Sequence, residues 1–218
     1  MGPRLTALQV VGDLDSWLAA GFAVTGDAVM LGSVAVHVIG PEVSSARPAI
    51  TAWGFDTTSA DRIDGLATFA EAMPAPAASD DHPNGISSID HVVVMTPTLD
   101  RTIDELVEAG FEIRRIRDAT IAGTAMRQAF IRAGDTILEI VGPAEPSIEA
   151  SGTTAASATF WGLAMVAPDL DATVRWFGPD CSPAKAAVQP GRRIATLDTR
   201  TLGIGIPIAL MSPHAVGS

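Results

Sequence analysis

The alternation of hydrophobic and polar positions is clearest in residues 88–143. The apolar run at residues 91–95 predicts a strand, and apolar residues at helical spacing between Leu99 and Val107 predict a helix that ends at Gly110. Three further strands are predicted at residues 111–116, 126–133 and 136–141. Residues 88–143 are therefore expected to form one module in the order β-α-β-β-β.

The same order of patterns recurs on both sides of this module. Residues 1–58 repeat it in a compressed form, in which LDSWLAAGF parallels the IDELVEAGF of the second module. Residues 157–214 repeat it a third time, with APDLD in place of TPTLD before the helix. The sequences WGF at 53–55 and WGL at 161–163 also echo each other, which indicates a recurring structural element.

The connections between the modules differ in length. Residues 59–87 are rich in Pro, Ala and polar residues and predict a linker between the first and second modules. The connection between the second and third modules is short, so these two are expected to form one compact unit to which the first is added. An unpaired module would leave a sheet face without a partner, which favours a homodimer.

Composition limits the compartment and the kinds of partner. Hydrophobic residues make up 47% of the 218 residues and charged residues 18%, which is enough for a substantial core. No uninterrupted apolar run reaches the length of a membrane span, and acidic residues near the N-terminus argue against a secretion signal. The single cysteine, Cys181, cannot form an intramolecular disulfide and favours the cytoplasm. The net charge of −11 argues against nucleic acid or an anionic membrane as partner.

Glu139 is the polar residue that most needs a chemical explanation. It lies in a predicted strand that is apolar on both faces, and such strands are usually buried on both sides. Burying an unpaired carboxylate costs several kcal/mol, so the group must be neutralised, paired or bound to a metal ion. A salt bridge to Arg127, Arg132 or Arg193 and a role in a metal or active site both remain open.

The four histidines occupy different contexts. His91 opens a strand directly after Asp90, where either an exposed strand end or a ligand position is possible, since neutral imidazole is a common metal ligand. His37 interrupts an apolar strand, and a histidine satisfied within the core or at a sheet edge is the simpler interpretation. His82 and His214, in a Pro-rich segment and in the tail, are expected to be exposed to solvent.

Candidate ligand-binding side chains lie beside or within predicted strands. Arg127 and Gln128 are adjacent in an alternating strand, so one of them faces any cleft and is able to bind a carboxylate or carbonyl. Arg193 stands at a strand start, and an arginine in the cleft of an acidic protein would select a small anionic ligand. Exposed charges at strand ends are the alternative for both arginines. Trp161 is a candidate for stacking on a ligand, with core packing as the simpler role.

The strand IDHVVV, a helix ending in AGF and the final strand GDTILEIVGP resemble the vicinal-oxygen-chelate superfamily of glyoxalases, bleomycin-resistance proteins and extradiol dioxygenases. The resemblance implies an α+β fold in which repeated βαβββ modules form curved mixed sheets around a cleft. It also implies metal ligands on the first and last strand of each module. In the second module these positions are His91 and Glu139.

The other modules depart from this ligand pattern. In the third module the matching positions are Gly162 and Ala209, neither of which has a metal-binding side chain. In the first module, His37 occupies the position that corresponds to Glu139 of the second module. If the first and second modules paired, His37, His91 and Glu139 would form a set of two histidines and one carboxylate, which suits divalent iron or manganese.

Two functions follow as expectations. The first is a metal-dependent lyase, isomerase or dioxygenase acting on a small molecule with vicinal oxygens, with Fe, Mn, Zn or Ni as the ion and Glu139 as a ligand or a catalytic base. The second is a metal-free protein that binds or sequesters a small, antibiotic-like molecule in the same cleft. Gly162 and Ala209 favour the second function, whereas the presence of both His91 and Glu139 favours the first.

Overall fold

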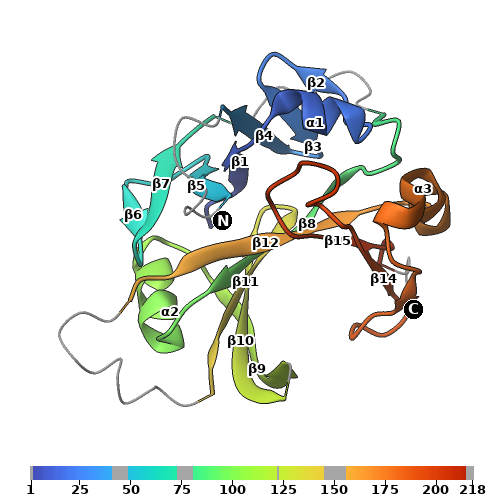
Figure 1. The fold of residues 1–218 in the computed structure, drawn as a ribbon. Coiled ribbons are helices and arrows are strands. Elements are labelled where there is room, and N and C mark those ends of the chain that lie inside the picture. Colours follow the sequence, from blue (N-terminus) through green and yellow to red (C-terminus); the bar gives the residue numbers. More distant parts are fainter. Residues whose placement is uncertain (1, 41–48, 73–80, 122, 145–155, 215–218) are drawn as a thin grey trace.

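The computed structural model describes residues 2–40, 49–72, 81–121, 123–144 and 156–214, and its strands and helices are shown in Figure 1. The N-terminal part contains, in order, β1 (Leu5–Val11), α1 (Leu14–Ala19), β2 (Val24–Thr25), β3 (Ala28–Leu31), β4 (Val34–Ile39), β5 (Ile50–Phe55), β6 (Arg62–Ile63) and β7 (Leu66–Ala70). The next part contains β8 (Ser88–Met95), α2 (Leu99–Glu108), β9 (Ile113–Ile121), β10 (Thr124–Ala133) and β11 (Thr136–Pro143). The last part contains β12 (Thr159–Val166), α3 (Leu170–Phe177), a 3-10 turn (Gly178–Asp180), β13 (Lys185–Ala186), β14 (Arg193–Thr196) and β15 (Ile208–Met211).

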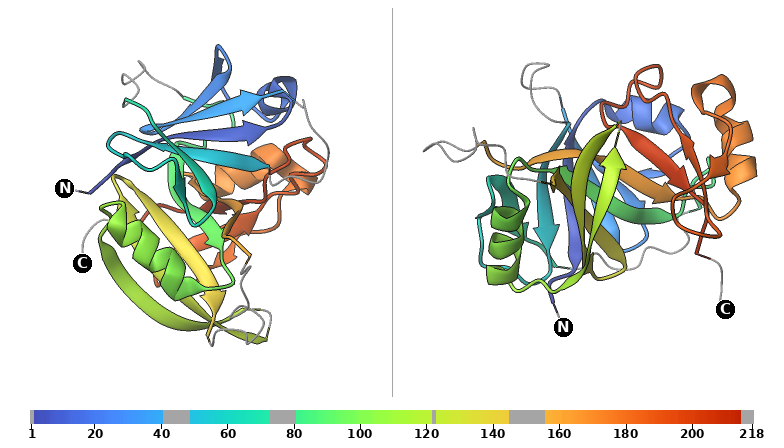
Figure 2. Two further views of the ribbon diagram at one scale, coloured as in Figure 1. Left: turned by 90° about the vertical axis from the view of Figure 1, so that its left-hand side faces the viewer. Right: turned by 90° about the horizontal axis from the view of Figure 1, so that it is seen from below.

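The described strands form two mixed sheets. The N-terminal sheet has seven strands in the order β2-β3-β4-β1-β5-β7-β6, and the C-terminal sheet has eight in the order β13-β14-β15-β12-β8-β11-β10-β9. Figure 2 shows the N-terminal sheet, blue to cyan, packed beside the C-terminal sheet, green to red. None of the helices that the structure describes is long and apolar enough to cross a membrane.

The second module has the predicted β-α-β-β-β order. Its helix α2 buries Leu99 and Leu106, and the backbone N–H groups of Gly110 and Phe111 bond to carbonyl groups of the last turn. Gly110 has a φ of 91°, which a glycine adopts without steric cost and which ends the helix. The predicted strands at 111–116 and 126–133 are longer in the structure, because β9 and β10 continue toward their hairpin.

The second and third modules share the C-terminal sheet, as expected. β8 pairs antiparallel with β12, while β8 and β11, and β12 and β15, pair in parallel on either side. This arrangement relates the two modules by an approximate twofold axis between β8 and β12. The alternative pairing of the first and second modules does not occur in the described sheets.

The N-terminal sheet has the same plan, which reveals a fourth module, in whose described residues no helix occurs. β1 pairs in parallel with β4 and antiparallel with β5, and β5 pairs in parallel with β7. The prediction of a linker at 59–87 is therefore wrong at β6 and β7, while residues 73–80 of that stretch lie outside the described residues. The equivalence of β5 and β12 explains the echo between residues 53–55 and 161–163. Since the four modules pair two by two, the argument for a homodimer from an odd module loses its basis.

One hydrophobic core extends across both sheets. Trp53 of β5 packs edge to face on Phe160 of β12, with ring centroids 5.1 Å apart. Phe55 packs in the same way on Phe111, at 4.9 Å. Aromatic pairs of this geometry stabilise a core beyond the area that they bury, so the two sheets are expected to unfold together.

His82 contradicts its prediction, because it is buried rather than exposed. Its Nδ1 accepts a hydrogen bond of 2.9 Å from the backbone N–H of Ala23. The neutral ring therefore carries its proton on Nε2, which lies 2.8 Å from the carbonyl oxygen of Met30 and donates to it. These two bonds tie the segment before β8 to the N-terminal sheet, a long-range role that a Pro-rich local sequence does not reveal.

We predict that Phe111→Ala lowers the free energy of unfolding by about 3–5 kcal/mol, because it removes a buried ring from the contact between the sheets. Val107→Ala is the matched control: Val107 is 51% exposed on α2, and its loss is expected to change stability by less than about 0.5 kcal/mol. Urea denaturation measures both. Two separate transitions, of which Phe111→Ala shifts one, would contradict a shared core.

Candidate ligand cleft

The C-terminal sheet is curved, with α2 and α3 on its outer side (Figure 1). α2 packs on β10 and β11, and α3 packs on β14. Alternate residues of β8 and β11 point away from the helices, because successive side chains of a strand point to opposite faces. His91 and Glu139 both lie on this inner face, and His91 Nε2 is 3.2 Å from Glu139 Oε2.

A cavity of about 410 Å³ lies on the inner face. We call it the apolar chamber, because its walls are mainly hydrophobic and its polar side chains gather around one point, at His91, Gln128 and Glu139. The other lining residues are Val93, Met95, Ile121, Val141, Trp161, Leu163, Ala164, Ile194, Thr196, Pro207, Ile208 and Ala209. Such a combination of apolar walls and a few convergent polar groups is typical of small-molecule sites.

Asp90, which forms a buried ion pair with Arg192, contacts the His91 nitrogen that does not face Glu139. Asp90 Oδ2 lies 2.8 Å from His91 Nδ1, and Asp90 Oδ1 lies 2.6 Å from Nη2 of Arg192, which is almost completely buried. Arg192 also donates to the carbonyl oxygen of Ser212 at 2.8 Å and to Oε1 of Gln189 at 3.0 Å. Burial raises the pKa of Asp90, but the hydrogen bonds from His91 and Arg192 outweigh it and hold the pKa at about 2.

Glu139 has the partners that the sequence left open. They are His91 and the side-chain amide of Gln128, which donates to Glu139 Oε1, rather than Arg127, Arg132 or Arg193. Gln128 is held in turn by Arg117, whose Nε donates to Gln128 Oε1 at 2.8 Å. Burial raises the pKa of Glu139, against the opposing charges of His91 and Arg117.

This arrangement gives the cleft one adaptable polar end. Because His91 Nδ1 faces the ionised Asp90, it carries a proton, and the ring presents Nε2 to Glu139. At that contact His91 Nε2 lies 3.2 Å from Glu139 Oε2. A ligand hydroxyl or carbonyl that reaches this point therefore finds both donor and acceptor groups.

Gln128 and Trp161 are the predicted ligand-binding residues that line the cleft. Trp161 is 58% exposed, so core packing is the wrong interpretation for it. It lies at a register shift between β12 and β8, where Phe160 pairs with Val94 and Gly162 with Val93. The extra residue of such a bulge is turned out of the regular ladder, which places the indole at the cleft wall.

Both predicted arginines lie on the outer side of the sheet. Arg127 pairs with Asp100 of α2 at 3.1 Å, and Arg193 pairs with Asp171 of α3 at 2.7 Å. Arg127 precedes Gln128 directly, so the alternation of the strand that brings Gln128 into the cleft turns Arg127 toward the helix. The exposed-charge alternative describes Arg193, whereas Arg127 is half-buried within β10.

His37 is not brought together with His91 and Glu139. It lies on β4 of the N-terminal sheet, with Nδ1 3.5 Å from Asp27 and Nε2 3.4 Å from Glu71. The two carboxylates contact different nitrogens of the ring, so the three side chains do not converge on one point. The expected set of His37, His91 and Glu139 is therefore not formed.

Sequence reasoning missed three members of the polar network. They are Asp90, which contacts His91, Arg117, which contacts Gln128, and Arg192, which contacts Asp90. The position of Asp90 directly before His91 was a usable signal. Arg192 stands beside the selected Arg193, but only the structure distinguishes the buried arginine from the exposed one.

The residues present do not fit a divalent ion held by the protein alone. The described residues contain no group of three or more His, Cys, Asp or Glu side chains arranged to bind a metal. The positions of β12 and β15 that correspond to His91 and Glu139 hold Gly162 and Ala209, neither of which has a metal-binding side chain. A Cβ atom at Gly162 would lie 2.6 Å from the carbonyl oxygen of Pro207, so the space for a ligand side chain there is filled by backbone.

Comparison with known proteins identifies the fold. No family model and no curated protein sequence matches this chain. A mutant of 4-hydroxymandelate synthase from Streptomyces coelicolor matches with a TM-score of 0.63 and 13% identity, over 100% of this chain and 94% of that one. A halotolerant catechol dioxygenase, BphC, matches with a TM-score of 0.59 and 11% identity, over 98% and 87% of the two chains. A catechol 2,3-dioxygenase has the same score and identity, over 99% and 91%.

The chain thus has the fold of the vicinal-oxygen-chelate superfamily, as the sequence resemblance implied. Its mixed sheets, which form no closed barrel in the part of the chain that the structure describes, match those of these neighbours. Identities this low establish a fold and leave the activity to be argued from the site.

We predict that Arg192→Met destabilises the protein by about 3–5 kcal/mol, because it leaves Asp90 buried without its ionic partner. The neighbouring substitution Arg193→Met is the control. It removes an exposed ion pair with Asp171 and is expected to cost less than about 1 kcal/mol. Equal losses of unfolding free energy in the two variants, measured with urea, would show that the buried pair does not hold the site.

We predict that the free energy of unfolding decreases at acid pH because Asp90 becomes protonated. Its folded pKa of about 2 lies below the usual 3.8, so the stabilisation is present above pH 4 and is lost as the pH falls through 2. The loss amounts to about 2 kcal/mol. Asp90→Asn should lack this loss, and the control Asp61→Asn, at an exposed position, should retain it. Parallel acid profiles of unfolding free energy for wild type and Asp90→Asn would contradict the assignment.

Proposed function

We propose that the chain binds a small aromatic molecule carrying a hydroxyl or carbonyl group in the apolar chamber, and that His91 and Glu139 hold this polar group without a metal ion. The chamber itself is the observation that carries the proposal. Its volume of about 410 Å³ falls in the range of roughly 300–1,000 Å³ typical of small-molecule sites. Its apolar walls favour an apolar body, and its one polar end favours a single polar group.

The polar end supports selection for a hydrogen-bonding ligand. Glu139 is largely buried, and a ligand without a polar group would remove water from it and from His91 without replacing the lost hydrogen bonds. Sites built to bond a hydroxyl reject the analogue that lacks it. The names of the similar structures refer to catechol and 4-hydroxymandelate, so phenols are the first class to test.

A metal-dependent lyase, isomerase or dioxygenase is the second candidate. The direct contact of His91 and Glu139, at positions where the superfamily resemblance implies ligands, favours it. It requires additional donors from water, the substrate or another subunit, since Gly162 and Ala209 supply none. In that case Glu139 would act as a ligand or as a base. A cytoplasmic location and a homodimer remain predictions for either candidate.

We predict that phenols bind the wild-type protein in the presence of a chelator and bind Ala209→Phe at least about tenfold more weakly. The phenylalanine ring occupies space in the chamber that the ligand needs. A tenfold loss of affinity corresponds to about 1.4 kcal/mol of binding free energy. Val188→Phe, at a position 82% exposed, is the control and should bind as wild type does. Calorimetry measures the affinity, and the fluorescence of Trp161 at the chamber wall provides a second readout.

The matching benzenes without a hydroxyl group test the polar end. Wild type should bind them more weakly than the phenols. Equal affinity for both series, or an unchanged affinity in Ala209→Phe, would contradict the proposal. Binding that disappears with the chelator and returns with a divalent ion would favour the second candidate.

A further inference from the structure

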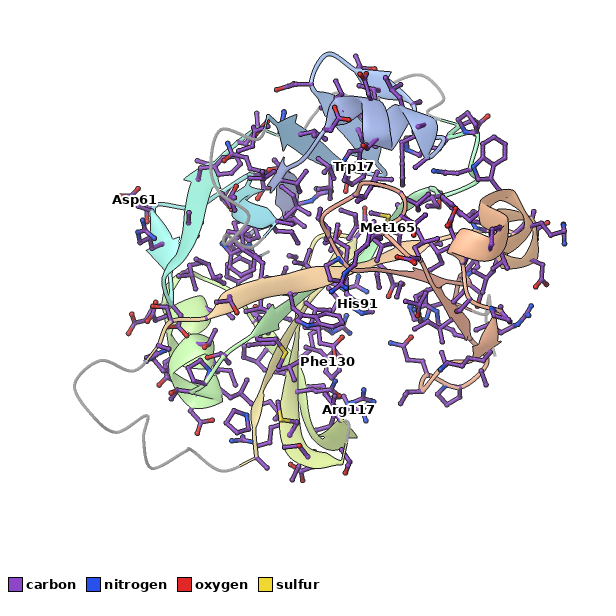
Figure 3. The ribbon with its side chains drawn as sticks, viewed as in Figure 1. Trp17, Asp61, His91, Arg117, Phe130 and Met165 are labelled. Atoms are coloured by element: carbon purple, nitrogen blue, oxygen red, sulfur yellow. The ribbon has the colours of Figure 1, made fainter. Side chains whose placement is uncertain are left out.

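A second cavity, of about 600 Å³, lies beside the apolar chamber. His91 lines both cavities, so they meet at the polar end of the cleft. The second cavity extends past Phe130 toward β9 and toward the turn between β3 and β4. In Figure 3, His91, Phe130 and Arg117 follow one another along the inner side of the C-terminal sheet.

The second cavity is lined by several arginines, and we therefore call it the basic chamber. Arg114, Arg115 and Arg132 line it, and within the described part of the chain no carboxylate oxygen lies within 4.0 Å of any of them. By contrast, Arg127 and Arg193 on the outer face each pair with an aspartate. Three arginines without ionic partners gathered at one cavity are unexpected in a chain with a net charge of −11.

The strand register explains why two of these arginines, Arg115 and Arg132, face the cleft. Arg115 on β9 stands directly opposite Phe130 on β10, which lines the basic chamber. Arg132 is two residues beyond Phe130 on the same strand and therefore points to the same face. Arg117 is two residues from Arg115, and its guanidinium lies 5.0 Å from the centre of the Phe130 ring.

The charges of the basic chamber sum to a positive value. Arg114, Arg115 and Arg132 contribute three positive charges, and Asp135, which also lines it, contributes one negative charge. The remaining carboxylate of the lining, Asp90, is neutralised by Arg192. The excess of two positive charges matches a phosphate monoester, which carries about −1.5 to −2 charges near neutral pH.

We infer that the basic chamber binds the phosphate group of a phosphate monoester whose apolar part lies in the apolar chamber. This inference rests on the proposed function and adds the substrate class, a phosphorylated small molecule. Guanidinium groups suit the role, because their planar array of N–H donors matches phosphate oxygens and stays charged at all relevant pH values. The predicted preference for an anionic ligand is thereby moved from Arg127 and Arg193 to Arg114, Arg115 and Arg132.

Three probes test the inference by calorimetry on the full chain: 3-phenylpropyl phosphate, the matching alcohol 3-phenylpropanol, and inorganic phosphate alone. We expect wild type to bind the phosphate ester at least about tenfold more tightly than the alcohol, as charge-assisted hydrogen bonds allow. The double variant Arg115→Gln, Arg132→Gln should lose about tenfold or more in affinity for the ester. Its affinity for the alcohol should not change, because neither arginine lines the apolar chamber.

Arg175→Gln is the matched control, because Arg175 is exposed on α3 and lines neither chamber. It should leave the binding of all three probes unchanged. An equal loss in Arg175→Gln and in the double variant would reduce the effect to net charge and overturn the inference. So would an ester that binds no more tightly than the alcohol, a result that leaves the proposed function standing.

Inorganic phosphate separates the two proposals further, because it needs only the basic chamber. If the alcohol does not bind but phosphate binds and is lost in the double variant, the proposed function fails and the basic site stands. If neither phosphate probe binds wild type, the basic site is overturned. Circular dichroism confirms that each variant is folded, which is expected for substitutions at exposed positions.

Discussion

The cleft depends on one buried ion pair, between Arg192 and Asp90. Neither charge is stable alone in the interior, and each gains most from the other because their atoms lie 2.6 Å apart. The pair joins the segment before β14 to β8, and so links the third module to the second. With one oxygen held by Arg192, Asp90 presents the other to His91, which fixes the ring that meets Glu139.

The half of the cleft contributed by the third module has a different chemistry. Gly162 lets the backbone of Pro207 approach β12, where Leu163 donates a hydrogen bond of 3.0 Å to the Pro207 carbonyl oxygen. This contact and Ala209 make that side apolar and closed. The cleft is thus asymmetric, with charges on the side of the second module and a hydrophobic wall on the other.

The sequence was sufficient for features that depend on local alternation. In the register of the parallel strands β8 and β11, His91 pairs with Ile137, which is two residues from Glu139. His91 and Glu139 therefore point to the same face of the sheet and lie close together. Periodicity also predicted the second module, and the short connection after it predicted its pairing with the third. A carboxylate in an apolar strand needs partners, and Glu139 has them in His91 and Gln128.

Other features depend on contacts between distant segments and were therefore missed. Among its described residues the fourth module has no helix, so the helical repeat of the other modules is missing there. The sequence pattern therefore predicts a linker where the short strands β6 and β7 lie. The face of the sheet to which each arginine side chain of β9 points depends on the register between β9 and β10. This register includes a shift between Phe130 and Ile131. Likewise, the bulge at Trp161 decides that the indole lines the cleft.

In the function proposed above, the charges of the chain, and not a metal ion, complete the polar end of the cleft. The most direct test is elemental analysis by mass spectrometry of protein purified without chelators from cells supplied with iron, manganese, zinc and nickel. We expect far less than one equivalent of any of these ions per chain, with the same content in His91→Ala. A full equivalent of one ion that is lost in His91→Ala and in Glu139→Ala would contradict it.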